Sequence, residues 1–79
     1  MKLTDIVVRK AAPRAKRYKL ADGGGMYLEV TPGGAKYWRL KYRVAGREKR
    51  LALGVYPTAS LSTARQGCQE AHRLLAQGI

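Results

Sequence analysis

Three basic side chains at alternate positions, Arg39, Lys41 and Arg43, form the pattern in this sequence best suited to chemistry. Guanidinium and ammonium groups donate hydrogen bonds to phosphate oxygens and to the O6 and N7 acceptors of guanine. Apolar or aromatic residues stand between them, and this alternation over Lys36 to Val44 predicts a half-buried β-strand. One face of that strand should therefore be basic, and the other should lie on a core.

Catalysis fits the remaining reactive side chains poorly. The five carboxylates belong to Asp5, Asp22, Glu29, Glu48 and Glu70. The predicted fold brings no two of them together, and Cys68 lies on an apolar helix stripe where a thiol behaves as a small hydrophobic group. The single histidine, His72, is predicted to be a solvated helix residue, and one Cys with one His makes no zinc site. We expect no catalytic residue, no metal ligand, no cofactor and no small-molecule substrate.

The net charge narrows the class of partner. Sixteen Lys and Arg residues against five Asp and Glu give +11 in 79 residues, whereas solubility alone needs only about 2 to 8 charges for a small domain. A polyanion is therefore favoured, and both nucleic acid and an anionic membrane surface fit that description. No run approaches the ~18 apolar residues of a membrane span, and the N-terminus lacks the apolar segment of a signal peptide. Of these two partners we expect nucleic acid, as double-stranded DNA, and no membrane. A single cysteine fits a reducing cytosol.

Lys36 to Leu53 is predicted to be a β-hairpin around the turn Ala45-Gly46. That turn sets Val44 opposite Arg47, Tyr42 opposite Lys49, Leu40 opposite Leu51, Trp38 opposite Leu53, Lys41 opposite Arg50 and Arg43 opposite Glu48. Like charges that face each other, such as Lys41 and Arg50, destabilise a sheet on their own. A chain that keeps them there should have an anionic partner.

Two shorter strands are predicted before the hairpin, at Tyr18–Asp22 and Met26–Thr31. The glycine-rich segment Asp22–Gly25 joins them, and it is predicted to be a hairpin turn because its spacing matches no phosphate-binding glycine pattern. A five-residue loop, Pro32–Lys36, then keeps apolar residues opposite apolar ones. The resulting pairs are Val30 with Trp38, Glu29 with Arg39, Leu28 with Leu40 and Tyr27 with Lys41.

The N-terminal part is predicted to be a short helix followed by a basic arm. The helix would lie within Leu3 to Ala11, with Thr4 as its N-cap and Pro13 ending it. From Arg9 to Lys19 there are six basic residues and no acid. Such a run is either a solvated arm or a set of phosphate contacts.

The C-terminal part is predicted to be a helix from Leu61 to about Gln77. The chain should leave the sheet after Leu53, because Pro57 cannot donate to a ladder. Ser60 would cap the helix, Gly78 would end it, and Gly67 within it suggests close packing on the sheet. Its apolar stripe contains Leu61, Ala64, Cys68, Ala71 and Leu75.

These elements predict a two-layer α+β domain, in which the C-terminal helix covers one face of a small antiparallel sheet of three to four strands. The core would contain Met26, Leu28, Val30, Trp38, Leu40, Tyr42, Leu51 and Leu53. The open face could enter the major groove of double-stranded DNA, which admits a β-ribbon. DNA contacts from that face would be Tyr27, Thr31, Tyr37, Arg39, Lys41, Arg43 and Arg50. Phosphate contacts from the arm and turns would be Arg14, Lys16, Arg17, Lys19, Lys36 and Arg47.

Two other functions stay open. An RNA-binding or ribosome-associated basic domain could use the same sheet, with Tyr27 and Tyr37 stacking on single-stranded bases. Cations outnumber aromatic residues on the face, which favours an intact duplex. A protein-interaction domain with incidental charge is the third hypothesis, and the concentration of charge on one face argues against it.

The chain resembles a known family in three segments that follow one another in order. They are LTDIVVRKAAP, YKLADGGGMYLEVTPGGAKYWRLKYRVAGREKRLALGVYP and SLSTARQGCQEAHRLLAQGI. Together they are similar to the N-terminal arm-binding domain of phage-type tyrosine recombinases, the integrases of prophages and genomic islands. The similarity covers essentially the whole chain, with Thr63 standing where the family pattern often has an acid that completes a capping box.

The resemblance implies that residues 1–79 form a single arm-type DNA-binding domain, the N-terminal part of a longer integrase that acts in the bacterial cytosol. Its sheet would enter the major groove of arm-type sites and position the recombinase, together with other protomers, for DNA integration and excision. The family's tyrosine nucleophile belongs to a separate catalytic domain without a counterpart here. None of the five tyrosines, Tyr18, Tyr27, Tyr37, Tyr42 and Tyr56, is therefore expected to be a nucleophile.

Overall fold

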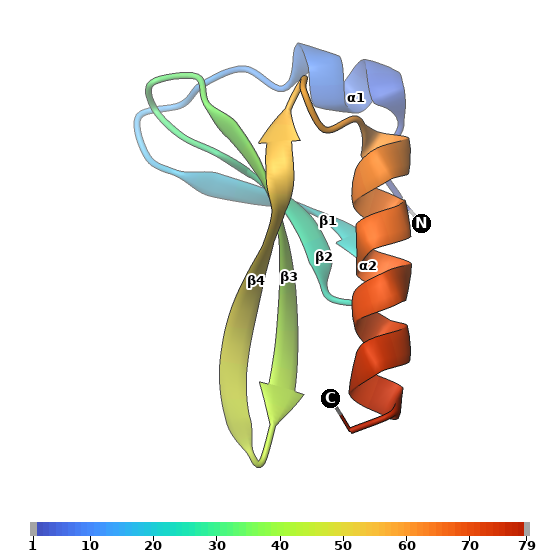
Figure 1. Cartoon of the computed structure of the whole chain (residues 1–79). Coiled ribbons are helices and arrows are strands. Elements are labelled where there is room, and N and C mark those ends of the chain that lie inside the picture. Colours follow the sequence, from blue (N-terminus) through green and yellow to red (C-terminus); the bar gives the residue numbers. More distant parts are fainter. Residues whose placement is uncertain (1, 79) are drawn as a thin grey trace.

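A computed structural model describes residues 2–78 and contains one antiparallel sheet flanked by two helices. Its elements are α1 (Asp5–Lys10), β1 (Tyr18–Gly23), β2 (Met26–Val30), β3 (Lys36–Val44), β4 (Arg47–Tyr56) and α2 (Leu61–Ala76). The four strands follow one another across the sheet in sequence order. α2 runs alongside the sheet, and α1 lies across one end near the start of α2 (Figure 1). The predicted α+β architecture is confirmed.

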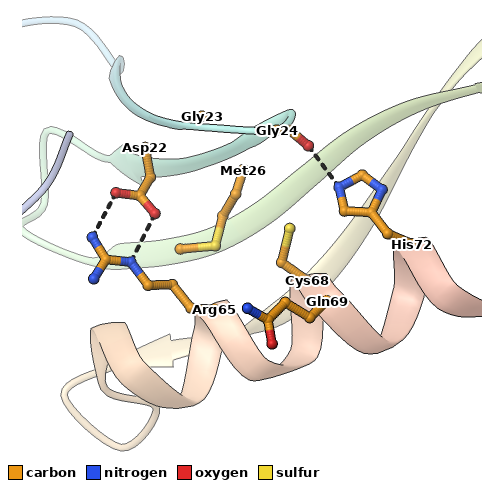
Figure 2. A pocket seen from close by; sticks show the side chains of 8 residues that line it. All are labelled: Asp22, Gly23, Gly24, Met26, Arg65, Cys68, Gln69 and His72. Carbon is orange, nitrogen blue, oxygen red and sulfur yellow. Dashed lines mark hydrogen bonds and ion pairs between the residues drawn. The ribbon is translucent and has the colours of Figure 1, made fainter. Parts of the chain in front are cut away.

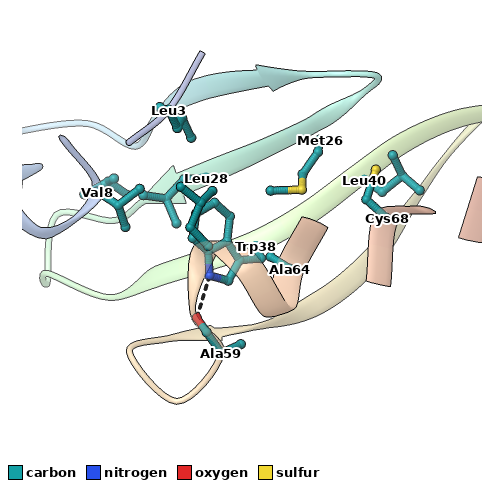
Figure 3. Close-up of a cluster of buried hydrophobic side chains, with 11 residues drawn as sticks. Leu3, Val8, Met26, Leu28, Trp38, Leu40, Ala59, Ala64 and Cys68 are labelled. Atoms are coloured by element: carbon teal, nitrogen blue, oxygen red, sulfur yellow. Dashed lines mark hydrogen bonds between the residues drawn. The ribbon is translucent and has the colours of Figure 1, made fainter. Parts of the chain in front are cut away.

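The core lies between α2 and one face of the sheet (Figure 3). Trp38 is fully buried at its centre, and its indole Nε1 donates to the carbonyl of Ala59 at 2.8 Å. That hydrogen bond satisfies the one polar atom of the side chain, which makes full burial tolerable. Five predicted core residues are buried, namely Met26, Leu28, Val30, Trp38 and Leu40. Leu3 and Val8 from the N-terminal segment join them.

The predicted core is less complete along the β3–β4 hairpin. Tyr42 and Leu53 pack against the core while staying partly exposed. Leu51 is 40% exposed, so its assignment to the core is wrong. It lies opposite Leu40, the last residue of β3 that pairs with β2, and it borders a shallow hollow shared with Tyr42 and Leu74.

The register between β2 and β3 differs from the predicted one by two residues. Leu28 pairs with Trp38 and Tyr27 with Arg39, whereas the prediction set Leu28 opposite Leu40. The loop has five residues, as expected, but it begins one residue earlier, at Thr31. The amide and hydroxyl of Thr31 cause this shift, because they close the loop through bonds with the carbonyl and amide of Ala35 at 2.9 and 3.0 Å.

β4 continues three residues further than predicted, to Tyr56. A β-bulge at Leu53 allows this, because Arg39 pairs with Ala52 while Trp38 pairs with Gly54. The predicted pair of Trp38 with Leu53 is therefore wrong, and the chain leaves the sheet only before Pro57. Gly54 has φ +134°, and a Cβ there would lie 2.6 Å from Cβ of Ala59, so only glycine fits this position.

The helix ends are where the sequence signals place them. The Thr4 hydroxyl accepts a hydrogen bond from the amide of Val7, and the Ser60 hydroxyl accepts one from Thr63. Both caps satisfy amides that would otherwise lack a partner in the first turn. α2 thus begins normally with Thr63 in place of an acid. Neither helix between residues 2 and 78 is long and apolar enough to cross a membrane.

Candidate nucleic-acid interface

The open face of the sheet carries the basic row predicted from β3. Tyr37 and Arg39 are half-buried, whereas Lys41 and Arg43 are exposed. Arg50 of β4 is exposed directly opposite Lys41, as the predicted register requires. Because side chains alternate along a strand and Trp38 is buried on the helix side, the odd-numbered residues of β3 face away from α2.

The β3–β4 hairpin projects beyond the rest of the sheet (Figure 1). β2 pairs with β3 only as far as Leu40, so Lys41–Arg50 continues as a two-stranded ribbon. The ribbon carries one acid, Glu48, and five cations, namely Lys41, Arg43, Arg47, Lys49 and Arg50. The major groove of B-DNA is wide enough to admit a two-stranded β-ribbon of this kind.

Two predicted contact residues of the open face are buried. Tyr27 is 5% exposed and Thr31 is 8% exposed. The Thr31 hydroxyl is used in the β2–β3 loop, and Lys19 lies over the Tyr27 ring with Nζ 5.0 Å from its centroid. Within residues 2–78 the Tyr27 hydroxyl has no hydrogen-bond partner. The face is therefore more strongly cationic, and offers less aromatic surface, than the sequence pattern indicated.

The basic residues assigned to phosphate contacts occupy different places. Lys19 is exposed on β1, on the same side of the sheet as Arg39, and Arg17 adjoins it. Arg14 and Lys16 are exposed in the arm, where the guanidinium of Arg14 lies 3.9 Å from the Tyr18 ring centroid. The exposed Arg47 lies at the turn of the ribbon.

Lys36 makes structural contacts instead of pointing freely into solvent. Its Nζ donates to the carbonyls of Val8 and Arg9, at 2.8 and 3.0 Å. These carbonyls belong to the last turn of α1, where a cation is favourable because the carbonyls there lack helical partners. Lys36 thereby attaches α1 to the start of β3.

An ion pair of Asp22 with Arg65 fixes the opposite side of the domain (Figure 2). The buried carboxylate accepts two bonds from the Arg65 guanidinium, both at 2.9 Å, and bonds from the amides of Lys2 and Leu3. The guanidinium also donates to the Leu3 carbonyl at 2.8 Å. The Arg65 bonds, aided by those amides, hold the pKa of Asp22 at about 2, below its usual 3.8. The pair joins β1, α2 and the N-terminal segment.

A hollow of about 230 Å³ lies beside this ion pair. Figure 2 shows Met26, Cys68 and Gln69 between Arg65 at one end and His72 at the other. Nε2 of His72 donates to the Gly24 carbonyl at 2.8 Å, so this exposed residue is tied to the β1–β2 turn. Burial raises the pKa of the Cys68 thiol, which fits its predicted role as a small apolar group.

No group of acids, His and Cys that could hold a metal occurs in the described part of the chain. The Asp22 carboxylate beside the hollow is already occupied by four donors. The hollow therefore provides packing and hydrogen bonds, and it offers no free acid for chemistry.

Two residues of structural importance were missed in the sequence. Asp22 was predicted to end the first strand and begin its turn but was given no role, although it shares the parity of Tyr18 and Leu20, which face the core. An acid on a core-facing position signals a buried cation partner, and Arg65 is that partner. Glu29 was placed on the open face but given no role, and it is in fact buried between Arg17 and Arg39.

The fold and the charged face define a small basic sheet-and-helix domain, and comparison with known proteins gives its family. Residues 3–79 match the model of the arm DNA-binding domain. The integrase of Enterobacteria phage P4 is 54% identical over 81 residues, which cover 100% of this chain and 18% of that protein. The integrase of Shigella phage Sf6 is 40% identical over 77 residues, covering 98% of this chain and 20% of that protein.

A third relative, prophage integrase IntZ of Escherichia coli (strain K12), is 43% identical over 79 residues, covering 98% of this chain and 20% of its own length. The chain belongs to the arm DNA-binding domain family, which confirms the resemblance to integrases noted in the sequence. It spans about a fifth of the length of these relatives.

Proposed function

We propose that this domain binds double-stranded DNA sequence-specifically, by placing the β3–β4 ribbon and the adjoining open face in the major groove. The observation that carries the proposal is the ribbon Lys41–Arg50, a two-stranded projection whose side chains are mostly cationic. Arg39, Lys41 and Arg43 would meet base edges, because they project from one side of a single strand. Arg14, Lys16, Arg17, Lys19 and Arg47 would contact flanking phosphates, which fix register without selecting sequence.

Within a longer integrase, the domain would hold a tyrosine recombinase on arm-type sites during integration and excision. Membership of the arm DNA-binding family supports this role, as do relatives named integrase. The duplex, other integrase protomers and the bacterial cytosol are then the expected partners and place of action. Strand exchange itself would belong to the remainder of such a protein.

Single-stranded RNA is the alternative partner, and the structure makes it less favourable. Binding of single strands depends on aromatic platforms that accept stacked bases. Tyr27 is buried, so Tyr37 is the one aromatic ring of the predicted contact set that keeps partial exposure among residues 2–78. Competition with single strands and structured RNA should therefore displace a bound duplex poorly.

A set of alanine substitutions tests direct readout by the sheet. Arg39→Ala and Lys41→Ala should weaken binding to a duplex selected from a random pool more than binding to random duplex, by about 1 to 3 kcal/mol of discrimination each. Arg14→Ala and Lys16→Ala are the matched controls, because they remove phosphate contacts and should weaken both complexes similarly. Fluorescence anisotropy at fixed salt measures both affinities. Equal losses in all four variants would refute readout by the sheet.

A further inference from the structure

Glu29 is an acidic side chain buried in the middle of the basic face. It is 6% exposed although it lies on the open side of β2, because two arginines cover it. Its Oε2 atom lies 3.4 Å from Nη1 of Arg17 and 3.5 Å from Nε of Arg39. A carboxylate withdrawn from water needs compensation by cations. The two arginines supply it, and in return their positions are constrained by the carboxylate.

Arg39 is held from two sides. Its guanidinium carbon lies 5.4 Å from the Tyr37 ring centroid, and Tyr37 stands directly opposite Glu29 in the sheet. Because the carboxylate contacts Nε, the two terminal nitrogens of Arg39 are left without an ion-pair partner in residues 2–78. The side chain retains 29% exposure, so a ligand can reach that end of the guanidinium.

A fixed guanidinium suits recognition of a base edge. Contact with guanine requires two N–H groups to meet O6 and N7 at the same time, which depends on the orientation of the plane. A side chain that is already ordered loses less conformational freedom when it binds. Lys41 is not ordered in advance in this way, because within residues 2–78 its ammonium pairs only with Glu48, which is itself 43% exposed.

We propose that Glu29 is a positioning residue, which orients Arg39 for direct readout and raises the selectivity of the face for its preferred duplex. The same negative charge opposes phosphate, so Glu29 lowers affinity for DNA in general while it increases discrimination. The inference rests on the proposed function, since it names the group that makes one contact of that interface selective.

The variant Glu29→Gln removes the charge and keeps the size of the side chain. The ratio of affinities for the selected and random duplexes should fall about tenfold, which lies within the discrimination of one bidentate Arg–guanine contact. Affinity for random duplex should rise, because a negative charge has left the face. The matched control is Glu70→Gln, which removes an exposed acid on α2, outside the proposed interface, and should leave the ratio within about twofold of wild type, since such exposed pairs constrain little.

A second variant, which leaves the net charge unchanged, separates the position of the carboxylate from its charge. Glu29→Asp keeps the buried charge but withdraws it from Nε of Arg39 by one methylene. It should lower the ratio while leaving affinity for random duplex unchanged.

The Nε–Hε signal of Arg39 in the free domain gives a readout that needs no DNA. Its heteronuclear NOE should report an ordered side chain in wild type and a mobile one in both Glu29 variants, with the dispersed backbone spectrum confirming the fold.

The outcomes separate the inference from the function beneath it. A wild-type domain that prefers no duplex sequence would remove the proposed function, and the inference with it. A selective wild type whose ratio is unchanged by Glu29→Gln and Glu29→Asp would overturn the inference alone. An equal fall in the ratio for Glu70→Gln would also overturn it, because net charge rather than orientation would then account for the loss.

Discussion

Asp22 and Glu29 are both buried carboxylates, and arginines from other elements satisfy each of them. Their consequences differ because their surroundings differ. Asp22 accepts four hydrogen bonds on the helix side, where it connects three parts of the chain. Glu29 lies under the proposed DNA-binding face, where its ion pair with Nε leaves the two terminal nitrogens of Arg39 without an ion-pair partner in residues 2–78. One acid therefore serves stability, and the other is proposed to serve recognition.

The ion pair of Asp22 predicts a pH dependence of stability. Its folded-state pKa of about 2 is below the usual 3.8, so its stabilisation is fully present above about pH 4 and is lost as the pH falls through about 2. We expect about 2 kcal/mol of the free energy of unfolding to disappear over that window. Asp22→Asn should remove this part of the pH dependence, as measured by urea unfolding between about pH 2 and pH 5.

The control for that measurement is Glu48→Gln, which removes a carboxylate that is 43% exposed. This variant keeps the Asp22–Arg65 pair, so it should still lose stability as the pH falls toward about 2. If Asp22→Asn kept the full wild-type slope in the acid range, another carboxylate would be responsible and the assignment to Asp22 would fail.

Alternation in the sequence predicted which face of the sheet each residue lies on, but it could not predict how far that residue is buried. Tyr27, Glu29 and Thr31 lie on the predicted open side and are nevertheless buried. Long basic side chains from the neighbouring strands cover the first two, with Lys19 over Tyr27 and Arg39 against Glu29. A pattern of period two cannot show such cover, because it depends on which side chains of adjacent strands meet.

At the level of elements, the helix caps follow from local signals, whereas strand register and the end of β4 depend on contacts between strands. The predicted and observed pairings of β2 with β3 differ by two residues, and both keep apolar residues on one face. Alternation cannot separate two registers of equal parity. The hydrogen bonds of Thr31 with Ala35 select the observed register of β2 with β3. The β-bulge at Leu53 sets the pairing of β3 with the far end of β4.

Alanine substitution at two glycines, Gly67 in α2 and Gly54 in β4, should change the free energy of unfolding in opposite directions. A Cβ at Gly67 would meet Cδ2 of Leu53 at 3.6 Å, an ordinary contact, so the close packing expected at this glycine leaves room for a methyl group. Gly67→Ala should raise the free energy of unfolding by up to about 1 kcal/mol, since alanine favours the helix. Urea unfolding at neutral pH measures the change.

Gly54→Ala is the comparison variant on β4. Its φ of +134° and the 2.6 Å approach to Ala59 leave no room for a side chain, so this variant should be destabilised. A loss of stability in Gly67→Ala would show that α2 lies closer to β4 than the present packing allows.

In the molecule as a whole, α2 and the ribbon Lys41–Arg50 have different roles. α2 covers one face of the sheet and contributes Leu61, Ala64 and Cys68 to the core, whereas the β3–β4 hairpin extends beyond the rest of the sheet (Figure 1). The cations of the ribbon are exposed. The chain has a net charge of +11, which should attract a polyanion before any specific contact forms.

Salt dependence tests the electrostatic part of this description. If about five phosphates are neutralised, the logarithm of affinity for duplex should fall with the logarithm of salt concentration at a slope near −4.5. Anisotropy titrations across a range of salt concentrations give the slope. Arg14→Ala should make it shallower by about one unit, and a flat response in wild type would favour a protein-interaction domain whose charge is incidental.

Intermolecular NOEs in a complex with the selected duplex would show whether the odd-numbered side chains of β3 lie in the major groove. We expect NOEs from Arg39, Lys41 and Arg43 to major-groove protons, such as cytosine H5 and thymine methyl groups. NOEs from the exposed side of α2 to the bases, or from the ribbon only to minor-groove protons, would contradict the account.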